Sequence, residues 1–222
     1  MIINEELSTS DPGFCLAYLA HSVLYVNNVF INANEEQRKR FLPQMCDGSS
    51  IGGVCITEPD GGTDVLGMRT TAVRKGKEYV LNGRKMWITN GAVNGGLRRF
   101  LSSCVELGDA FLVYAKVDGK ITSFIVEKGM PGFSLGQQIK HKLGMRASGT
   151  AELVFEDVVV PESNRLGEEG QASLCMVFFR SNDEFLDAQL GNRARDPGGT
   201  IGRRRRFSVM TMRELRSAVC RS

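Results

Sequence analysis

The sequence is poor in the residues that build metal centres and disulfide frameworks. It holds six cysteines, none in a Cys-x-x-Cys pair, and only two histidines, so we expect neither a zinc site nor a disulfide scaffold. It lacks an apolar run of the roughly 20 residues that cross a bilayer. Its acidic start also lacks the basic pattern of a signal or transit peptide. These absences predict no metal, no membrane span and no visible targeting segment.

Positive charge is confined to the end of the chain. Residues 180–222 hold ten arginines, no lysine and five acidic residues, a net charge of +5 within an overall +3. The preceding residues therefore carry −2, which gives no electrostatic case for binding nucleic acid. The four consecutive arginines at 203–206 lack interleaved aromatic residues, so a basic nucleic-acid arm is the weaker interpretation of this tail.

Helical patterns occupy the first part of the sequence. In residues 11–31 apolar side chains recur near the helical period, and Asp11-Pro12 is a typical helix start. Asn34 is suited to cap a second helix, with two glutamates in its first turn, and Asp47-Gly48 ends it. A helical segment of about 50 residues is therefore expected, before an all-β domain of about 110 residues, which is an ordinary domain size.

From residue 51 the pattern changes to short strands separated by turn residues. Gly76, Asn82-Gly83 and Asp118-Gly119 are hairpin signals. The expected strands are residues 70–75, 78–81, 85–89, 110–117, 121–127 and 151–160. Many short strands joined by tight turns indicate a barrel or a sandwich. The predicted fold class is α+β, a partial helical domain followed by an all-β domain.

Residues 55–64 are the segment with the clearest chemical character. They run from an apolar strand end into Gly61-Gly62, with Thr57 and Thr63 on either side. Paired glycines let backbone N–H groups approach a phosphate closely, and the threonines add side-chain donors. The alternative is a polar turn that only caps a strand, and composition alone favours that alternative.

The order of several motifs resembles the acyl-CoA dehydrogenase family. The amino-acid sequence of residues 124–133 is most similar to that of its isovaleryl-CoA branch. The resemblance covers roughly residues 11–178 and rests on residues 34–43, 55–64, 85–91, 124–133, 142–146 and 153–158. It implies a remnant of the N-terminal helical domain at 1–48, the middle β-barrel at 49–162, the start of the C-terminal helical domain at 163–178, and an aberrant, out-of-frame or disordered tail at 179–222. The C-terminal helical bundle would be missing.

This resemblance implies FAD as cofactor, bound on the barrel. The isoalloxazine edge would lie on the strand end, the phosphates on the glycine turn, and a Thr89 hydroxyl would donate towards flavin N5. Trp87 would pack on the flavin ring rather than serve as a core aromatic, and Thr63 would also meet the acyl-CoA substrate. The implied cofactor-binding residues are Cys55, Ile56, Thr57, Gly62, Thr63, Trp87, Ile88 and Thr89.

The resemblance further implies α,β-dehydrogenation of a short branched acyl-CoA in leucine breakdown, with electrons passing to an electron-transfer flavoprotein. It also implies a mitochondrial matrix location and the family's homotetramer, whose contacts would come largely from the missing bundle. The position of the catalytic base falls on Ser181, and serine without a partner base cannot remove the α-proton. Glu184 lies three residues beyond Ser181, so it is out of register with the position of the base.

Two departures leave alternatives open. Residues 93–107 are longer than the family's loop, so they form either a surface insertion or a disturbance beside Thr89. Because the base is missing, three interpretations stand. The chain is a dehydrogenase by lineage, a catalytically dead fragment that holds FAD or acyl-CoA weakly, or an inert β-domain that only keeps the fold.

Overall fold

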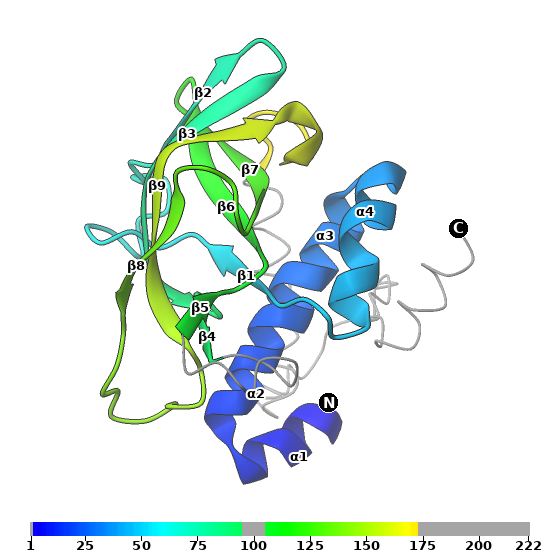
Figure 1. Ribbon diagram of the computed structural model, residues 1–222, viewed down its shortest axis with the longest axis vertical. Helices are drawn as coiled ribbons and strands as arrows, with labels where there is room; N and C mark the ends of the chain where they lie inside the picture. Colours follow the sequence, from blue (N-terminus) through cyan, green and yellow to red (C-terminus); the bar gives the residue numbers. More distant parts are fainter. Residues whose placement is uncertain (1, 95–104, 173–222) are drawn as a thin grey trace, which may run out of the picture.

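The computed structural model describes residues 2–94 and 105–172, and its helices lie together on one side of a curved sheet (Figure 1). A short α1 comes first, which the sequence did not predict. One continuous helical segment then follows, with a wider π-helical stretch in its middle, before α4. The bounds are α1 (Ile2–Ser10), α2 (Pro12–Leu19), η1 (Ala20–Asn27), α3 (Asn28–Asn32) and α4 (Glu35–Cys46).

Both predicted helix starts are confirmed by their capping bonds. The Asp11 carboxylate accepts from the amides of Gly13 and Phe14 at 2.8 and 3.1 Å. At α4 the Asn34 side chain accepts from the Gln37 amide, and the Gln37 side chain accepts from the Asn34 amide. This reciprocal pair satisfies donors that a helix start leaves without intrahelical partners.

The strands form one eight-stranded sheet and one small ribbon. The sheet runs in the order β10-β7-β6-β2-β3-β9-β8, and β1 pairs with β6 in parallel. The ribbon pairs β4 (Ala92–Asn94) with β5 (Val105–Leu107). The sheet's strands are β1 (Gly52–Cys55), β2 (Thr71–Lys75), β3 (Glu78–Thr89), β6 (Ala110–Val117), β7 (Lys120–Glu127), β8 (Phe133–Gln138), β9 (Thr150–Pro161) and β10 (Arg165–Leu166).

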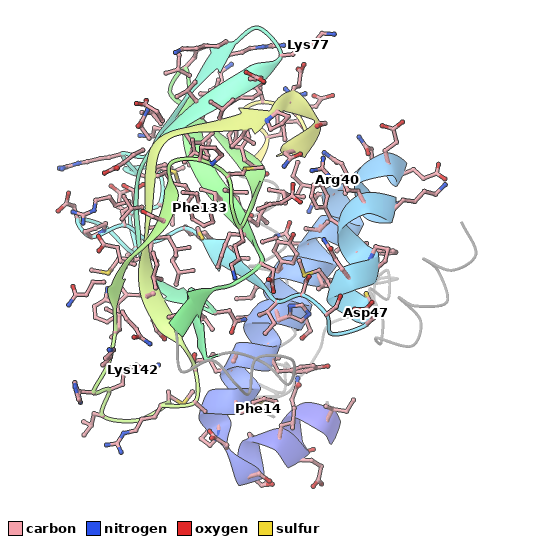
Figure 2. The ribbon with its side chains drawn as sticks, in the orientation of Figure 1. Phe14, Arg40, Asp47, Lys77, Phe133 and Lys142 are labelled. Carbon is pink, nitrogen blue, oxygen red and sulfur yellow. The ribbon has the colours of Figure 1, made fainter. Side chains whose placement is uncertain are left out.

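Strand β6 is buried on both faces because it separates two cores. Leu112 and Tyr114 pack with Tyr25 of η1 in the core beneath the helices. The alternate residue Phe111 points to the other core, enclosed by the sheet's own curvature. There it meets Phe133 of β8 (labelled in Figure 2) with ring centroids 5.8 Å apart, although β8 and β6 are not neighbours in the sheet. Helices followed by a curved β domain confirm the predicted fold class.

The helix from Pro12 to Asn32 differs from the expectation in one respect. It is 21 residues long and contains an 18-residue window with a mean hydropathy of 1.5, so it is long and apolar enough by composition to cross a membrane. The expectation that the sequence lacks such a run is therefore wrong. In this fold its side chains Tyr25, Val26 and Val29 are fully buried against the sheet and α4. Packing inside the protein core accounts for the apolar character of this face, whereas Phe14, Leu16 and Ile31 are exposed.

One predicted hairpin is wrong. Asn82-Gly83 does not turn the chain, because β3 continues through it as a single strand of 12 residues paired with β9. The pairing shifts register between Leu81 and Gly83, which is a β-bulge. Asn82 exchanges two hydrogen bonds with Asp157 of β9, and Gly83 lies against Thr70. Contacts with residues distant in sequence therefore override the local preference of Asn82-Gly83 for a turn. The hairpin turns at Gly76 and Asp118-Gly119 are confirmed.

Residues 95–104 and 173–222 lie outside the described part of the chain. The predicted insertion is therefore described only at its two ends, as β4 and β5. The predicted aberrant tail and the base position at Ser181 both fall outside the described residues.

Candidate functional site

The glycine turn begins where β1 leaves the sheet. The Glu58 amide donates to the Gly61 carbonyl at 2.9 Å, and the Gly61 amide donates back at 3.2 Å, so the turn is closed on itself. The Thr57 carbonyl accepts from the Met86 amide of β3 at 2.8 Å. This bond places the two most distinctive sequence segments, residues 55–64 and 85–91, side by side.

Trp87 projects from a second bulge in β3. The pairing with β9 shifts register between Lys85 and Ile88, and Trp87 adopts a φ of +63°. A positive φ is rare for a bulky residue and points to local constraint. The Trp87 side chain is 58% exposed, whereas Ile88 beside it is buried in the sheet's core. The bulge thus turns a large planar ring away from the protein.

A buried ion pair lies beneath the turn and the bulge. The Lys85 ammonium donates to Glu58 Oε1 at 2.9 Å and to the Ile56 carbonyl at 3.0 Å. Their side chains are 0% and 7% exposed. Thr70 adds two bonds to Glu58 Oε1, from its amide at 2.9 Å and its hydroxyl at 2.5 Å, and the Arg69 amide donates to Oε2 at 2.6 Å. The carboxylate is fully engaged.

The environment keeps the pair ionised and the nearby thiol neutral. Burial alone would raise the pKa of Glu58, but hydrogen bonds from Thr70, the Arg69 amide and Lys85 outweigh it and hold that pKa at about 2. Burial lowers the pKa of Lys85, and the carboxylate opposes that change. Burial also raises the pKa of the Cys55 thiol, so Cys55 is protonated and unsuited to nucleophilic chemistry.

The structure brings all eight expected cofactor residues to one end of β1 and β3, but not with equal access. Cys55 and Ile88 are buried, so only their backbone atoms can reach a ligand. Gly62 and Thr63 are exposed, and Ile56, Thr57 and Thr89 are half-buried. Within residues 2–94 and 105–172, the hydroxyls of Thr57 and Thr89 and the amides of Gly62 and Thr63 donate to no protein acceptor. These donors are available to a ligand.

Sequence reasoning missed Glu58, Lys85 and Thr70. Glu58 and Lys85 stand inside the quoted motifs, yet nothing in their spacing shows that residues 27 apart in sequence form a buried pair. The one available signal was weak. A lysine amid the apolar strand residues 86–88 needs a partner if it faces inward.

The end of β3 is held by two further side chains. Asn90, with a φ of +64°, donates from its amide to the carbonyls of Ala17 and Gly52 at 3.1 and 3.0 Å. His21 of η1 accepts from the Gly52 amide at Nδ1, 3.0 Å, so its Nε2 carries the proton that is donated to the Met45 carbonyl at 3.1 Å. Burial lowers the pKa of His21, consistent with this neutral form. These bonds fix β1 against the helices.

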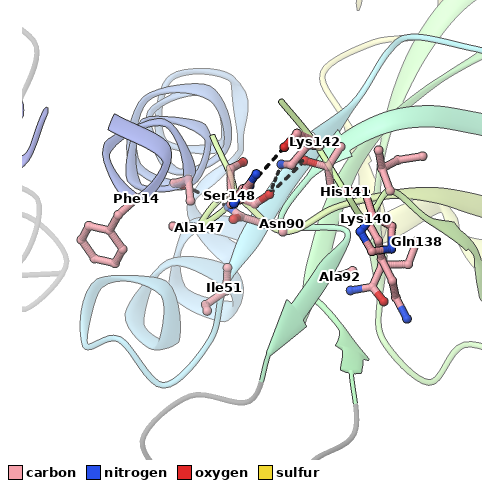
Figure 3. A pocket seen from close by; sticks show the side chains of 15 residues that line it. Phe14, Ile51, Asn90, Ala92, Gln138, Lys140, His141, Lys142, Ala147 and Ser148 are labelled. Carbon is pink, nitrogen blue, oxygen red and sulfur yellow. Dashed lines mark hydrogen bonds between the residues drawn. The ribbon is translucent and has the colours of Figure 1, made fainter. Parts of the chain in front are cut away.

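A pocket of about 730 Å³ lies between α2 and the loop joining β8 to β9. In Figure 3, Phe14 lies on one side and Gln138 and Lys140 on the other. Its basic side chains are Lys140, His141, Lys142 and Arg146, and none of the described residues that line it is acidic. None of the eight expected cofactor residues lines it either. The pocket is a separate feature from the face around Trp87.

Comparison with known proteins agrees with this arrangement. Residues 1–49 match the acyl-CoA dehydrogenase N-terminal domain, and residues 53–158 match the acyl-CoA dehydrogenase middle domain. The mitochondrial isovaleryl-CoA dehydrogenase of Pongo abelii is 42% identical over 184 residues, which are 80% of this chain and 40% of that protein.

Solved structures give the same result. Butyryl-CoA dehydrogenase from Megasphaera elsdenii superposes with a TM-score of 0.69 at 36% identity, covering 79% of this chain and 43% of that one. An acyl-CoA dehydrogenase from Bacillus anthracis, solved in complex with FAD, gives 0.68 at 36% identity, covering 79% of this chain and 28% of that one. The chain spans about 40% of the length of the curated relatives it matches. The matches to both domains and the shared fold show that the chain belongs to the acyl-CoA dehydrogenase family.

Proposed function

We propose that this chain forms the FAD-holding wall of an acyl-CoA dehydrogenase, and that the whole protein oxidises a short branched acyl-CoA at its α,β bond. The observation that carries the proposal is the outward Trp87 ring, which stands at a strained φ of +63° beside donors without protein acceptors. Backbone strain of this kind concentrates at binding and active sites. An inert β-domain that only keeps the fold would not require an outward tryptophan at a strained backbone position.

The residues present fit a flavin. A planar aromatic side chain that is 58% exposed offers a stacking surface. A Cβ added at Gly62 would meet nothing nearer than Thr57 Cγ2 at 3.6 Å, so the turn is open to a ligand. The free amides of Gly62 and Thr63 suit phosphate oxygens. The hydroxyls of Thr57 and Thr89 suit the polar edge of the ring system.

Each residue has a proposed task. Thr57 and the backbone of Cys55, Ile56 and Ile88 orient the flavin edge, while Trp87 covers one face and excludes water. Thr89 places a hydroxyl where it stabilises charge near N5. FAD, when bound, supplies the hydride acceptor.

The proposed substrate contact lies in this chain, whereas the catalytic base is expected from another part of the whole protein. Thr63, exposed at the turn, is the proposed contact to the acyl-CoA. Relatives named for isovaleryl-CoA and butyryl-CoA support a short acyl chain. The base would come from the C-terminal helical domain, where the family's position aligns with Ser181, outside the described residues. The competing candidate is therefore a chain that holds FAD without catalysis.

The partners and the cellular location of the whole protein are proposed from its family. We propose that the whole protein passes electrons to an electron-transfer flavoprotein. We also propose a mitochondrial matrix location and a role in leucine breakdown, because the chain is similar to mitochondrial isovaleryl-CoA dehydrogenases. The homotetramer of the family is proposed for the whole protein. Within the described residues, His, Cys, Asp and Glu side chains form no group of three or more that could hold a metal ion.

The test is a titration of the purified chain with FAD, followed by ultrafiltration to separate free from bound flavin. Trp87→Ala should weaken binding about tenfold, since loss of aromatic stacking removes roughly 1.4 kcal/mol. Leu143→Ala, at a fully exposed side chain in the loop between β8 and β9, is the matched control. Equal affinity in all three proteins would contradict the proposal.

Catalysis is tested separately, by adding isovaleryl-CoA to the FAD-loaded chain without oxygen. Loss of the oxidised-flavin absorbance would show a working base within this chain, and Glu184 would be the first residue to replace. Bound FAD without any absorbance change would support the non-catalytic alternative.

A further inference from the structure

The side chains of Lys85 and Trp87 break the alternation of a β-strand. Residues two apart in a strand point to the same face, yet Lys85 is 0% exposed and Trp87 is 58% exposed. Lys85 pairs with Leu153 of β9, whereas Ile88 pairs with Ala151. Three steps along β3 thus match two along β9, and the extra residue reverses the direction of Trp87.

Strand β9 does not hold this bulge, because the ladder is interrupted there. The bonds that hold it come from the chain leaving β1. The Ile56 carbonyl accepts from the Lys85 ammonium, and the Thr57 carbonyl accepts from the Met86 amide. A positive φ at a tryptophan persists only where surrounding contacts over-determine it.

Glu58 completes this restraint. Its carboxylate joins Lys85 to the amides of Arg69 and Thr70, so one buried pair links three segments of chain. A second ion pair in the same turn, between Asp60 and Arg69, is 66% and 79% exposed and lies at the surface. The buried pair contacts the backbone of Ile56, Arg69 and Thr70.

We propose that the Glu58–Lys85 pair is a positioning device that locks the register of β3 at Trp87 and so keeps the indole ring facing outward. If the pair is lost, β3 slips by one residue against β9, and a slip of one residue carries a side chain to the opposite face. The consequence for flavin rests on the proposed function, because the ring set outward is the one proposed to cover the cofactor.

The position of the ring can be measured without any cofactor. Trp87 is the single tryptophan of the chain, so its fluorescence and its quenching by acrylamide report on this site alone. We expect Lys85→Met and Glu58→Gln to lower the quenching constant at least twofold and to shift emission to shorter wavelength, as the ring turns inward. Asp60→Asn, in the same turn, should leave both values unchanged.

The double variant Glu58→Gln/Lys85→Met separates positioning from simple support of the fold. Either single change leaves an unpaired buried charge and can unfold the chain, whereas the double change removes both charges and restores folding. A folded double variant whose quenching constant remains at least twofold low supports the proposal. A folded double variant with wild-type quenching and emission overturns it, because the ring then keeps its place without the pair.

FAD binding provides the second measurement. Where the wild-type chain binds FAD, the double variant should bind at least tenfold more weakly, and unchanged affinity would refute the link between the pair and the cofactor. If the wild-type chain binds no FAD, the proposed function fails for this chain. The fluorescence comparison still decides whether the pair positions Trp87.

Discussion

The pairing of β3 with β9 carries two bulges, one on each strand, and they are built in different ways. In the first, two steps along β3 from Leu81 to Gly83 match three steps along β9, so the extra residue lies in β9, where Asp157 has a φ of +51° and is bonded at the surface to Asn82. The second, at Met86–Trp87, forces a bulky residue to a φ of +63° and is held by a buried ion pair. An aspartate tolerates a positive φ comparatively well, whereas a bulky tryptophan keeps one only where surrounding contacts over-determine it. The strained bulge stands on the face proposed for FAD.

The largest expected effect is at the strained bulge. Lys85→Ala leaves the Glu58 carboxylate buried without its cation, so the free energy of unfolding should fall by about 3–5 kcal/mol. Urea denaturation followed by circular dichroism measures it. Lys39→Ala, which breaks an exposed pair with Glu35, is the control and should leave it nearly unchanged. Similar losses in both variants would show that the buried pair has no special role.

Acid should weaken the strained bulge next. The pKa of Glu58 is about 2 in the folded chain against an ordinary 4.5, so the unfolded chain takes up the proton first as pH falls. The contribution is complete above pH 4.5 and is lost as pH falls towards 2, by at most about 3 kcal/mol. Unfolding free energies measured across this range should show the slope, and Glu58→Gln should flatten it. An unchanged slope in that variant would assign the acid sensitivity elsewhere.

The first bulge should respond through crowding at Gly83, which lies on β3 opposite the extra residue of β9. An alanine Cβ at Gly83 would lie 2.5 Å from Thr70 Oγ1 and 2.8 Å from Thr70 Cα, so Gly83→Ala should lower the free energy of unfolding by about 2 kcal/mol. Gly76→Ala, in an open turn at φ +63° with nothing within 4 Å, isolates the backbone part at about 1 kcal/mol. If thermal melting shows equal losses, the close contact with Thr70 is not what matters.

The smallest effect has the opposite sign. Asparagine tolerates a positive φ better than tryptophan, so Trp87→Asn should raise the free energy of unfolding by about 0.5–1 kcal/mol while weakening FAD binding. Trp87→Ala, which removes the ring but keeps a strained backbone, is the matched control for stability. No difference between the two variants in chemical denaturation would mean that the bulge stores no strain.

Features fixed by neighbouring residues were predictable from the sequence. Asp11 and Asn34 cap helices through amides two or three residues away, and Asp118-Gly119 turns a hairpin by its own backbone preference. Asn82-Gly83 has the same local preference, but Asp157 and Thr70 override it from distant parts of the chain. Local signals succeed where the partner is local.

The candidate site likewise has a part that was predictable from the sequence and a part that was not. Its motif residues were located by resemblance, and the fold brings them to one end of β1 and β3. That Lys85 and Ile88 both turn inward while Trp87 turns outward depends on the bulge. The bulge in turn depends on Glu58, whose partners are 11 to 27 residues away. No periodicity within β3 contains that information.

The parallel pairing of β1 with β6 has a consequence for how the chain folds. Gly52 meets Ala110, so this pairing closes a loop that spans the whole first half of the β domain. Hairpins such as β6–β7 and the capped helices form from local contacts and are fast, whereas such long-range pairing is slow. Residues 56–58 hold the bulge only after β1 has docked. We therefore expect the environment of Trp87 to be established late in refolding, after most secondary structure has formed.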